Sequence, residues 1–157
     1  NEAGNLDKLG ALPGELNEKC APHFKAYEVI LTEFLGGKFK ADFEKRIHFE
    51  PINYMLGRTL DNALIIVDEA QTVEPVLMKL MLERVGNNSK IVIVGDKSQI
   101  YSGGKRGGLQ HVIVQFFDEN EKPLIESAQY IRLTSEDVMR SEFCKAVVKR
   151  YEENPLQ

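Results

Sequence analysis

Residues 63–71 have the sequence ALIIVDEAQ, an apolar run of strand length that ends directly in the acids Asp68 and Glu69. Residues 91–99, IVIVGDKSQ, form a second apolar run that ends in the same way at Asp96. Continuous apolar runs of this kind predict strands covered on both faces, as in a parallel sheet. The carboxyl ends of parallel strands meet at one edge of the sheet. We therefore expect the two acidic turns, residues 68–71 and 95–99, to lie close together.

The rest of the chain alternates predicted helices with predicted strands. Helical spacing of apolar residues predicts helices over residues 15–35, 75–85 and 109–117, and a final helix within 135–151. Short strands are predicted at residues 47–49 and 130–133, besides those at 63–67 and 91–94. Such an order is typical of an α/β domain with a mostly parallel sheet flanked by helices.

Three of these helices have an apolar face that is expected to pack. The first carries a stripe of Leu16, Cys20, Phe24, Tyr27, Leu31 and Phe34, the second turns Val76, Leu77, Leu80, Met81 and Val85 inward, and the last carries Phe143, Val147 and Tyr151. Gly36 and Gly86 are expected to end the first two helices.

The composition is that of an ordinary globular domain. The chain has 157 residues, a net charge of -4 and 43% hydrophobic residues. No apolar run approaches the roughly 20 residues that cross a bilayer, and no signal peptide is visible. Cys20 and Cys144 are far apart, and His23, His48 and His111 are scattered, so the spacing predicts neither a disulfide framework nor a metal cluster. We expect a cytoplasmic protein that does not engage a membrane.

The first acidic turn has the chemistry of a Mg-nucleotide site. Asp68 leaves a buried strand at a fixed point of the sheet edge, where a carboxylate can hold Mg²⁺ directly or through water. Glu69 comes next and can polarise the water that attacks a γ-phosphate. Gln71 completes the group as a nucleotide-binding residue. The alternative is a solvated turn without function, which the presence of a second acidic turn makes less favourable.

The second acidic turn supplies complementary groups. Gly95 allows a tight turn at the strand end, and Asp96 can join the outer shell of the ion. The Gln99 amide can donate to a γ-phosphate oxygen and accept a hydrogen bond from the attacking water. An ordinary Gly-Asp turn is the alternative.

Two further segments are candidates for phosphate contacts. Arg140 follows the last predicted strand, where a guanidinium can neutralise charge on a transferring phosphoryl group, and a surface arginine is the alternative. Gly57, Arg58 and Thr59 form a turn that can hold a nucleic-acid phosphate, although a plain turn is equally compatible. The basic loop at residues 103–108, GGKRGG, lacks the Ser or Thr of a phosphate loop. The pattern G-x-x-x-x-G-K-[ST] does not occur in the sequence.

Taken together, these motifs resemble PhoH-like proteins, the phosphate-starvation-inducible P-loop ATPases. The resemblance covers nearly the whole chain. It rests on the segments 3–4, 9–14 (LGALPG), 54–60 (YMLGRTL), 65–71, 78–79, 89–90, 94–99 and 137–140 (DVMR), in this order.

The resemblance implies a RecA-like P-loop NTPase core, shared with superfamily-one helicases, as a single domain over residues 1–157 that is partial at its N-terminus. By resemblance the cofactors are ATP and Mg²⁺, the ion is held by Asp68 of a Walker B motif, and Gln71, Gly95 and Asp96 line the nucleotide site. Glu69 is then the catalytic base, Gln99 the γ-phosphate sensor and Arg140 the arginine finger, while Gly57, Arg58 and Thr59 lie near nucleic acid. The first strand and the phosphate (Walker A) loop of the family are missing.

These implications leave several functions open. The leading hypothesis is an ATP-hydrolysing protein coupled to RNA or another single-stranded nucleic acid, in which a homo-oligomer would let Arg140 act on a neighbour's nucleotide. The alternative is a non-catalytic nucleic-acid-binding or assembly module on a RecA-like frame, against which the acidic net charge argues weakly. An active helicase ranks last, because the chain is too short for a second RecA-like domain.

Overall fold

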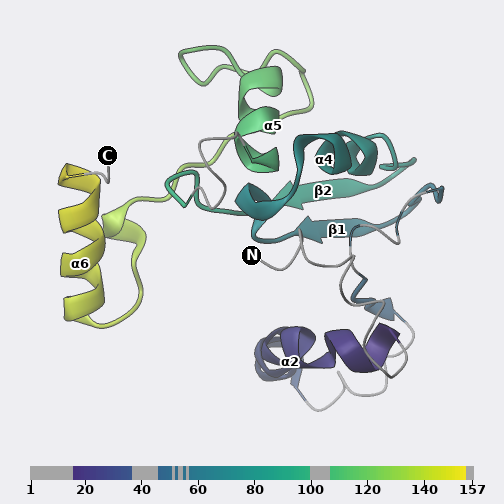
Figure 1. Ribbon diagram of the computed structural model, residues 1–157, viewed down its shortest axis with the longest axis horizontal. Coiled ribbons are helices and arrows are strands. Elements are labelled where there is room, and N and C mark those ends of the chain that lie inside the picture. The colour runs from purple at the N-terminus through teal and green to yellow at the C-terminus, as the bar shows by residue number, and fades with distance from the viewer. Residues whose placement is uncertain are drawn as a thin grey trace.

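The computed structural model describes residues 16–36, 46–50, 52, 55, 57–99 and 107–154, with side chains from residue 24 onward. Its elements in chain order are α2 (Leu16–Leu35), β1 (Leu64–Val67), the short helix η4 (Ala70–Thr72), α4 (Pro75–Leu82), β2 (Lys90–Ile93), α5 (Gly108–Phe116), the short helix η5 (Ser135–Asp137) and α6 (Glu142–Glu153) (Figure 1). Of the basic loop at residues 103–108, the part at 103–106 lies outside the described residues.

The centre of the fold is a parallel pair of strands joined by a helix. β1 pairs with β2 so that Leu64 lies opposite Lys90 and Val67 lies opposite Ile93. Two hydrogen bonds close the ends of the pair, from Lys90 N to Ala63 O at 2.9 Å and from Val94 N to Val67 O at 2.8 Å. With α4 between the strands this is a βαβ unit, and the predicted α/β class with a parallel sheet is confirmed.

The core lies on one side of this sheet, beneath α4 and α5. Its buried members are Val67, Ala70, Val73, Met78, Met81, Leu109 and Val112, with Ile65, Ile91 and Ile93 packed against them. Gly108 brings the start of α5 close, since a Cβ there would lie 3.0 Å from both Met78 Cβ and Val73 O. The absence of a side chain at residue 108 thus sets how closely α5 can approach α4.

The helix α4 differs from its prediction in its inner face and its end. Met78 and Met81 are its buried residues, whereas Val76, expected to face inward, is 67% exposed. The packing of α5 over Met78 determines which face of α4 is buried. The spacing of apolar residues along α4 does not by itself determine that face. The helix ends at Leu82, and Val85 instead forms an isolated bridge with Leu60 just before Gly86.

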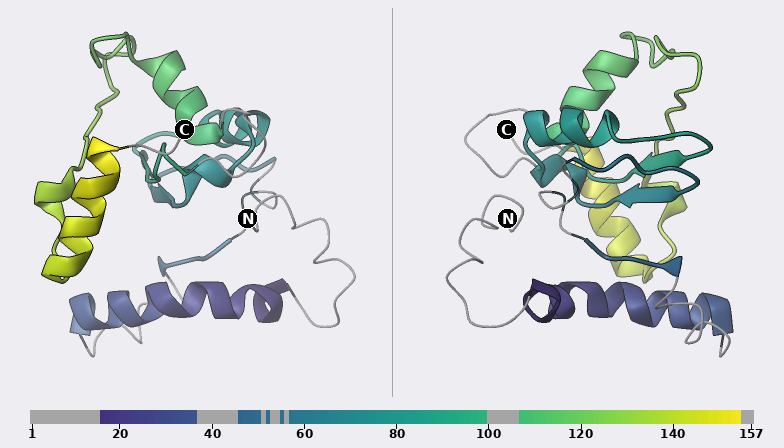
Figure 2. Two further views of the ribbon diagram at one scale, coloured as in Figure 1. Left: turned by 60° about the vertical axis from the view of Figure 1, so that its left-hand side comes forward. Right: turned by 90° about the vertical axis from the view of Figure 1, so that its right-hand side faces the viewer.

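The opposite face of the sheet is uncovered, so the expectation of strands covered on both faces is wrong for the described residues. Leu64 and Ile66 are 66% and 64% exposed, and Val92 and Val94 are exposed as well. The reason is visible in Figures 1 and 2, in which α4 and α5 lie on the same side and α2 stands apart from the sheet. Burial along β1 therefore alternates, as in a sheet packed on one face.

The helix α2 runs through Pro22 without ending and stops before Gly36, whose φ of 66° is left-handed. Its predicted stripe is only partly packed, because Phe34 is 83% exposed. Phe24 stacks on Phe49 with ring centroids 4.9 Å apart, and Tyr27 lies 6.0 Å from the same ring. Residues 47–49 form no strand, contrary to expectation. Phe49 contacts the aromatic side chains of α2 instead.

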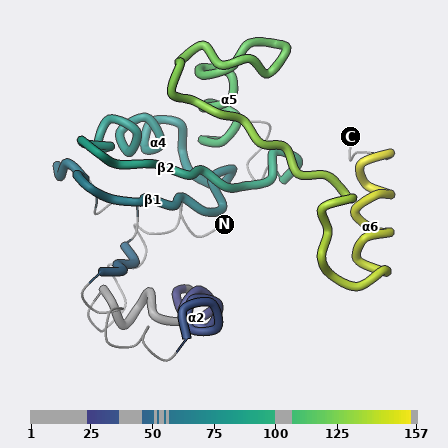
Figure 3. Tube along the Cα trace, turned by 180° about the vertical axis from the view of Figure 1, so that it is seen from behind, coloured from purple at the N-terminus to yellow at the C-terminus, as the bar shows by residue number. Residues whose placement is uncertain are grey.

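The C-terminal part departs most from the prediction. The helix α5 is confirmed, but residues 130–133 join no sheet. The helix expected within 135–151 is divided, because Thr134 caps η5 through a capping box and Ser141 separately caps α6. The stripe of α6 is exposed, with Phe143 at 79%. Seen from behind, α6 stands well away from the sheet (Figure 3).

Candidate functional site

The two acidic turns meet at the carboxyl edge of the sheet, as the parallel strands require. Val67 and Ile93 are in register, so the turns that follow them begin side by side. The backbone of the first turn is bonded to that of the second, because Ala70 N donates to Val94 O at 3.0 Å. Asp68 and Glu69 are thus brought to the same edge as Asp96.

The buried side chain of Gln71 joins the two turns. Its Nε2 donates to Glu69 Oε2 at 2.7 Å, and its Oε1 accepts from Asp96 N at 3.1 Å. Gly95 makes room for this bridge, because a Cβ there would lie 2.3 Å from Gln71 Oε1. Any larger residue at position 95 would displace the amide or the backbone around it.

Glu69 has an unusual backbone conformation at the centre of the site. Its φ of 53° and ψ of 36° place it in the left-handed region, where it precedes η4. Such a conformation costs a residue with a Cβ roughly 1 to 2 kcal/mol. The turn offsets this cost with hydrogen bonds, since both the backbone N and the Oγ1 of Thr72 donate to Glu69 O at 2.9 and 2.8 Å. Strained residues of this kind cluster at functional sites.

Both carboxylate oxygens of Asp68 accept hydrogen bonds. Glu69 N donates to Oδ1 at 2.8 Å, and the hydroxyl of Tyr27 donates to Oδ2 at 2.5 Å. The bond to Asp68, together with partial burial and the charges of Asp68 and Glu69, raises the pKa of Tyr27 to about 12. Sequence analysis does not predict this contact, because Tyr27 fits an apolar helical stripe and lies 41 residues from its partner along the chain.

The second acidic turn is closed by its own side chains. Asp96 Oδ1 accepts from Ser98 N at 2.8 Å and from Ser98 Oγ at 2.6 Å, and Oδ2 accepts from Gln99 Nε2 at 3.0 Å. Partial burial acts to raise the pKa of the Asp96 carboxyl, but the bonds from Ser98 and Gln99 outweigh it and lower that pKa overall. Gln99 therefore lies beside Asp96 at the edge where the sequence predicts it.

The predicted nucleic-acid turn lies at the other end of β1. Gly57 has a φ of 88°, and Arg58 is exposed and pairs with Glu50 at 3.1 Å. Thr59 and Leu60 lead into the bridge that precedes β1, whereas Asp68 follows that strand. None of the contacts between described residues joins this turn directly to the acidic turns.

Arg140 is not brought to the sheet edge. It is exposed between η5 and α6, beside an open hollow of about 460 Å³ that Asp137, Met139 and Cys144 also line. The loop after residue 133 was expected at the sheet edge because residues 130–133 were expected to form a strand. Since they join no sheet, that loop lies away from the sheet together with α6 (Figure 1).

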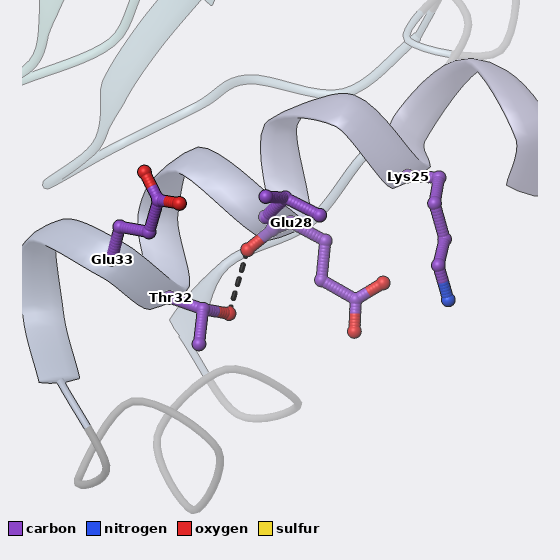
Figure 4. Close-up of a pocket in the computed structure, with 5 residues that line it drawn as sticks. Lys25, Glu28, Thr32 and Glu33 are labelled. Atoms are coloured by element: carbon purple, nitrogen blue, oxygen red, sulfur yellow. Dashed lines mark hydrogen bonds between the residues drawn. The ribbon is translucent and has the colours of Figure 1, made fainter.

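A further hollow, of about 240 Å³, lies along one face of α2 and is lined by Lys25, Glu28, Val29, Thr32 and Glu33 (Figure 4). Thr32 Oγ1 donates to Glu28 O at 2.7 Å within the helix. A single helix supplies the whole lining, and none of the predicted site residues takes part. This hollow therefore does not compete with the acidic turns as a candidate site.

The donor set at the sheet edge suits a hydrated Mg²⁺ that is shared with a phosphate ligand. In the described part of the chain, no group of three or more His, Cys, Asp or Glu side chains could enclose a metal. Mg²⁺ is commonly bound through one or two carboxylates, several waters and the phosphates of a substrate. Asp68, with Asp96 nearby, meets this requirement.

No helix within the described residues is both long and apolar enough to cross a membrane. The free thiol of Cys144 is half-buried in α6.

Comparison with known proteins identifies the relatives of this chain. A family model described as PhoH-like protein matches residues 2–152. The chain is 36% identical over 154 residues to a PhoH-like protein of Synechocystis sp., covering 96% of this chain and 44% of the relative. It is 33% identical over 150 residues to Protein PhoH of Escherichia coli K12, covering 92% and 41%. It is 36% identical over 154 residues to a PhoH-like protein of Bacillus subtilis, covering 96% and 46%.

The chain thus spans less than half the length of these curated relatives. Its parallel sheet with helices packed on it is consistent with a P-loop NTPase-like fold. The family match extends over both acidic turns, the turn at Gly57 and the segment around Arg140. By the extent of this match, the chain belongs to the PhoH-like protein family.

Proposed function

We propose that this chain forms the Mg²⁺-binding and water-activating part of an ATPase. The observation that carries the proposal is the junction of the two acidic turns through Gln71 at the carboxyl edge of a parallel sheet. This edge is where α/β sheets bind their ligands. Asp68 would hold the ion, which would neutralise charge between the β- and γ-phosphates of ATP. Gly95 and Asp96 would line the nucleotide side of the turns, and Gln71 would hold the turns in place.

In this proposal Glu69 is the catalytic base. The Gln71 amide bonded to its Oε2 leaves the other carboxylate oxygen available to accept a proton from the attacking water. Because the left-handed turn at Glu69 is fixed by Thr72 and Gln71, the base does not have to be ordered when substrate binds. Pre-arranged groups of this kind lower the reorganisation that catalysis requires.

Gln99 and Arg140 would complete the response to the γ-phosphate. The Gln99 amide donates a hydrogen bond to Asp96, and we propose that it exchanges this bond for one to the γ-phosphate of ATP. Arg140 is exposed and directly precedes α6, which stands away from the sheet, so we propose that it acts as an arginine finger on the nucleotide of a neighbouring copy. The whole protein would then function as a homo-oligomer.

The residues that bind the phosphates of ATP would have to lie elsewhere in the whole protein. The sequence contains no G-x-x-x-x-G-K-[ST] loop, whose backbone amides and lysine cradle phosphates in P-loop enzymes. The relatives are more than twice as long as the matched region. We therefore propose that ATP binds between such a loop in the remaining part and the acidic turns of this chain, in the cytoplasm, where ATP is supplied.

Replacing Glu69 by Gln in the full-length protein tests this function. The substitution keeps the size of the side chain but removes its basicity, so kcat for ATP hydrolysis should fall roughly 10²- to 10⁴-fold. Glu74→Gln is the matched control, because Glu74 is exposed and its side chain makes no cap hydrogen bond at the start of α4. Steady-state phosphate release with saturating Mg·ATP is the measurement. Equal rates for wild type and Glu69→Gln would refute the proposed role.

Coupling to RNA or another single-stranded nucleic acid is the further part of the proposal. Arg58 is the cation of the candidate turn, and its pairing with Glu50 is exposed enough to be exchanged for a phosphate. The alternative function is a nucleic-acid-binding or assembly module that does not hydrolyse ATP, for which the exposed pairing of Arg58 with Glu50 would serve equally well. Salt-sensitive RNA binding by a full-length protein that neither binds nor hydrolyses ATP would select this alternative.

A further inference from the structure

Tyr27 contacts the candidate Mg²⁺ ligand from a distant part of the chain. Its hydroxyl donates to Asp68 Oδ2 at 2.5 Å, whereas α2 otherwise stands apart from the sheet. A separation of this size is characteristic of a charge-assisted O–H···O⁻ bond, which is shorter and stronger than a bond between neutral groups. The contact thus concerns the one carboxylate on which the proposed ion site depends.

The hydrogen bond from Tyr27 is the second of two that hold the Asp68 carboxylate in place. Glu69 N holds Oδ1 at 2.8 Å, so each oxygen of Asp68 accepts one hydrogen bond from a different direction. An ionised carboxylate has about four lone-pair positions, and each oxygen retains capacity for a further ligand. Asp68 is exposed and would otherwise rotate in solvent. With both donors in place, its free lone pairs have a defined direction.

Tyr27 is itself held by aromatic packing. Its ring lies 6.0 Å from that of Phe49 with a tilt of 38°, and Phe24 stacks on the same Phe49 at 4.9 Å. Such pairs contribute about 0.5 to 1.5 kcal/mol beyond the area they bury. The phenol is therefore supported by side chains that do not belong to the acidic turns, which is how a positioning group is usually fixed.

We propose that Tyr27 is a positioning residue of the nucleotide site, whose hydroxyl orients the Asp68 carboxylate toward the Mg²⁺ of Mg·ATP. This inference rests on the proposed function, since it concerns the same ion. It adds α2 to the parts of the chain that act on the reaction. A purely structural tether between α2 and the sheet would leave ion binding unchanged.

The substitution Tyr27→Phe in the full-length protein separates these possibilities. It removes only the hydroxyl and keeps the ring that packs on Phe49. Binding of Mn²⁺, a paramagnetic substitute for Mg²⁺, would be measured by electron paramagnetic resonance with a non-hydrolysable ATP analogue, next to the Mg²⁺ dependence of hydrolysis. We expect the dissociation constant and the half-saturating Mg²⁺ concentration to rise roughly two- to tenfold, the effect of losing one hydrogen bond. Tyr151→Phe, an exposed tyrosine of α6, is the control and should change neither value.

A double-mutant cycle keeps the test decisive if Tyr27→Phe also lowers thermal stability. In an Asp68→Asn background the hydroxyl should have no further effect on Mn²⁺ binding, because it acts through that carboxylate. Unchanged or tighter Mn²⁺ binding by Tyr27→Phe would overturn the inference while leaving the proposed function intact. A wild-type protein without Mg²⁺-dependent hydrolysis or Mn²⁺ binding would overturn the proposed function, and the inference with it.

Discussion

At the scale of single residues, Gln71 uses both ends of its amide, one on each acidic turn. The side chain is buried, so breaking either bond would leave a polar atom without a partner in a dry environment, at a cost of about 1 to 3 kcal/mol. A direct contact between Gln71 and a nucleotide would require such a break. We therefore expect Gln71 to act on the nucleotide through the residues it holds, Glu69 and Asp96.

The hydroxyl of Tyr27 gives a second residue-scale prediction, which concerns pH. Its pKa is raised to about 12 from 10.0, because the neutral phenol donates to Asp68. The contribution of the Tyr27–Asp68 hydrogen bond to the stability of the folded protein is therefore complete below pH 10, and it is lost as the pH rises toward 12. The phenolate absorbance of wild type minus that of Tyr27→Phe should show one tyrosine that ionises well above pH 10. A difference spectrum with a midpoint near pH 10 would mean that the phenol does not donate to the carboxylate in solution.

At the scale of elements, the one-sided core predicts unequal effects of mutations on the two sides of the sheet. Met78 is fully buried between α4 and α5, so Met78→Ala should lower the free energy of unfolding by about 2 to 5 kcal/mol. Ile66, on the uncovered face, is the matched comparison, and Ile66→Thr should change it by no more than about 0.5 kcal/mol. Urea denaturation of the full-length variants is the measurement. A large loss for Ile66→Thr would show that this face is covered in the whole protein.

The elements that the sequence predicted well are those whose local signals agree with their packing. The apolar runs of β1 and β2 and the spacing in α5 each coincide with a buried face, so their positions were predicted within a residue or two. The junction of the acidic turns at one edge followed from the parallel order of the strands. For residues 130–133 the β-like composition was present, but a strand also needs an edge to pair with, and that depends on the rest of the fold.

The parts of the candidate site that were missed depend on contacts between distant segments. The bond from Tyr27 to Asp68 joins residues 41 apart, and helical periodicity treats a tyrosine as one more apolar position. The role of Gln71 as a bridge required the register of β1 against β2, which the sequence does not give. Arg140 lies away from the edge because residues 130–133, which were expected to form a strand, join no sheet.

At the scale of the whole molecule, the proposed arginine-finger role of Arg140, which directly precedes an α6 that stands away from the sheet, predicts that catalysis needs two copies. Full-length Arg140→Ala and Glu69→Gln proteins should each be inactive, and mixing them should restore activity. In a ring of equal parts, about a quarter of the sites would combine an intact base with a neighbour's intact arginine. Phosphate release by the mixture, after subunit exchange, is the measurement. The control is a mixture of Glu69→Gln with the Arg140→Ala, Glu69→Gln double variant, which should stay inactive because neither protein has an intact base. If the first mixture regains no ATPase activity after subunit exchange, Arg140 acts in the site of its own subunit.

The short segment at residues 46–50 links two regions of the molecule that otherwise lie apart. Phe49 packs against Tyr27, which holds Asp68, and the next residue, Glu50, pairs with Arg58. One planar peptide bond joins the backbones of Phe49 and Glu50, so a change in the backbone of either residue constrains the other. A polyanion that drew Arg58 away from Glu50 would thereby loosen or shift the support of Tyr27. In the proposed function, this segment would connect a polyanion bound at one end of β1 with the carboxylate of Asp68 at the other.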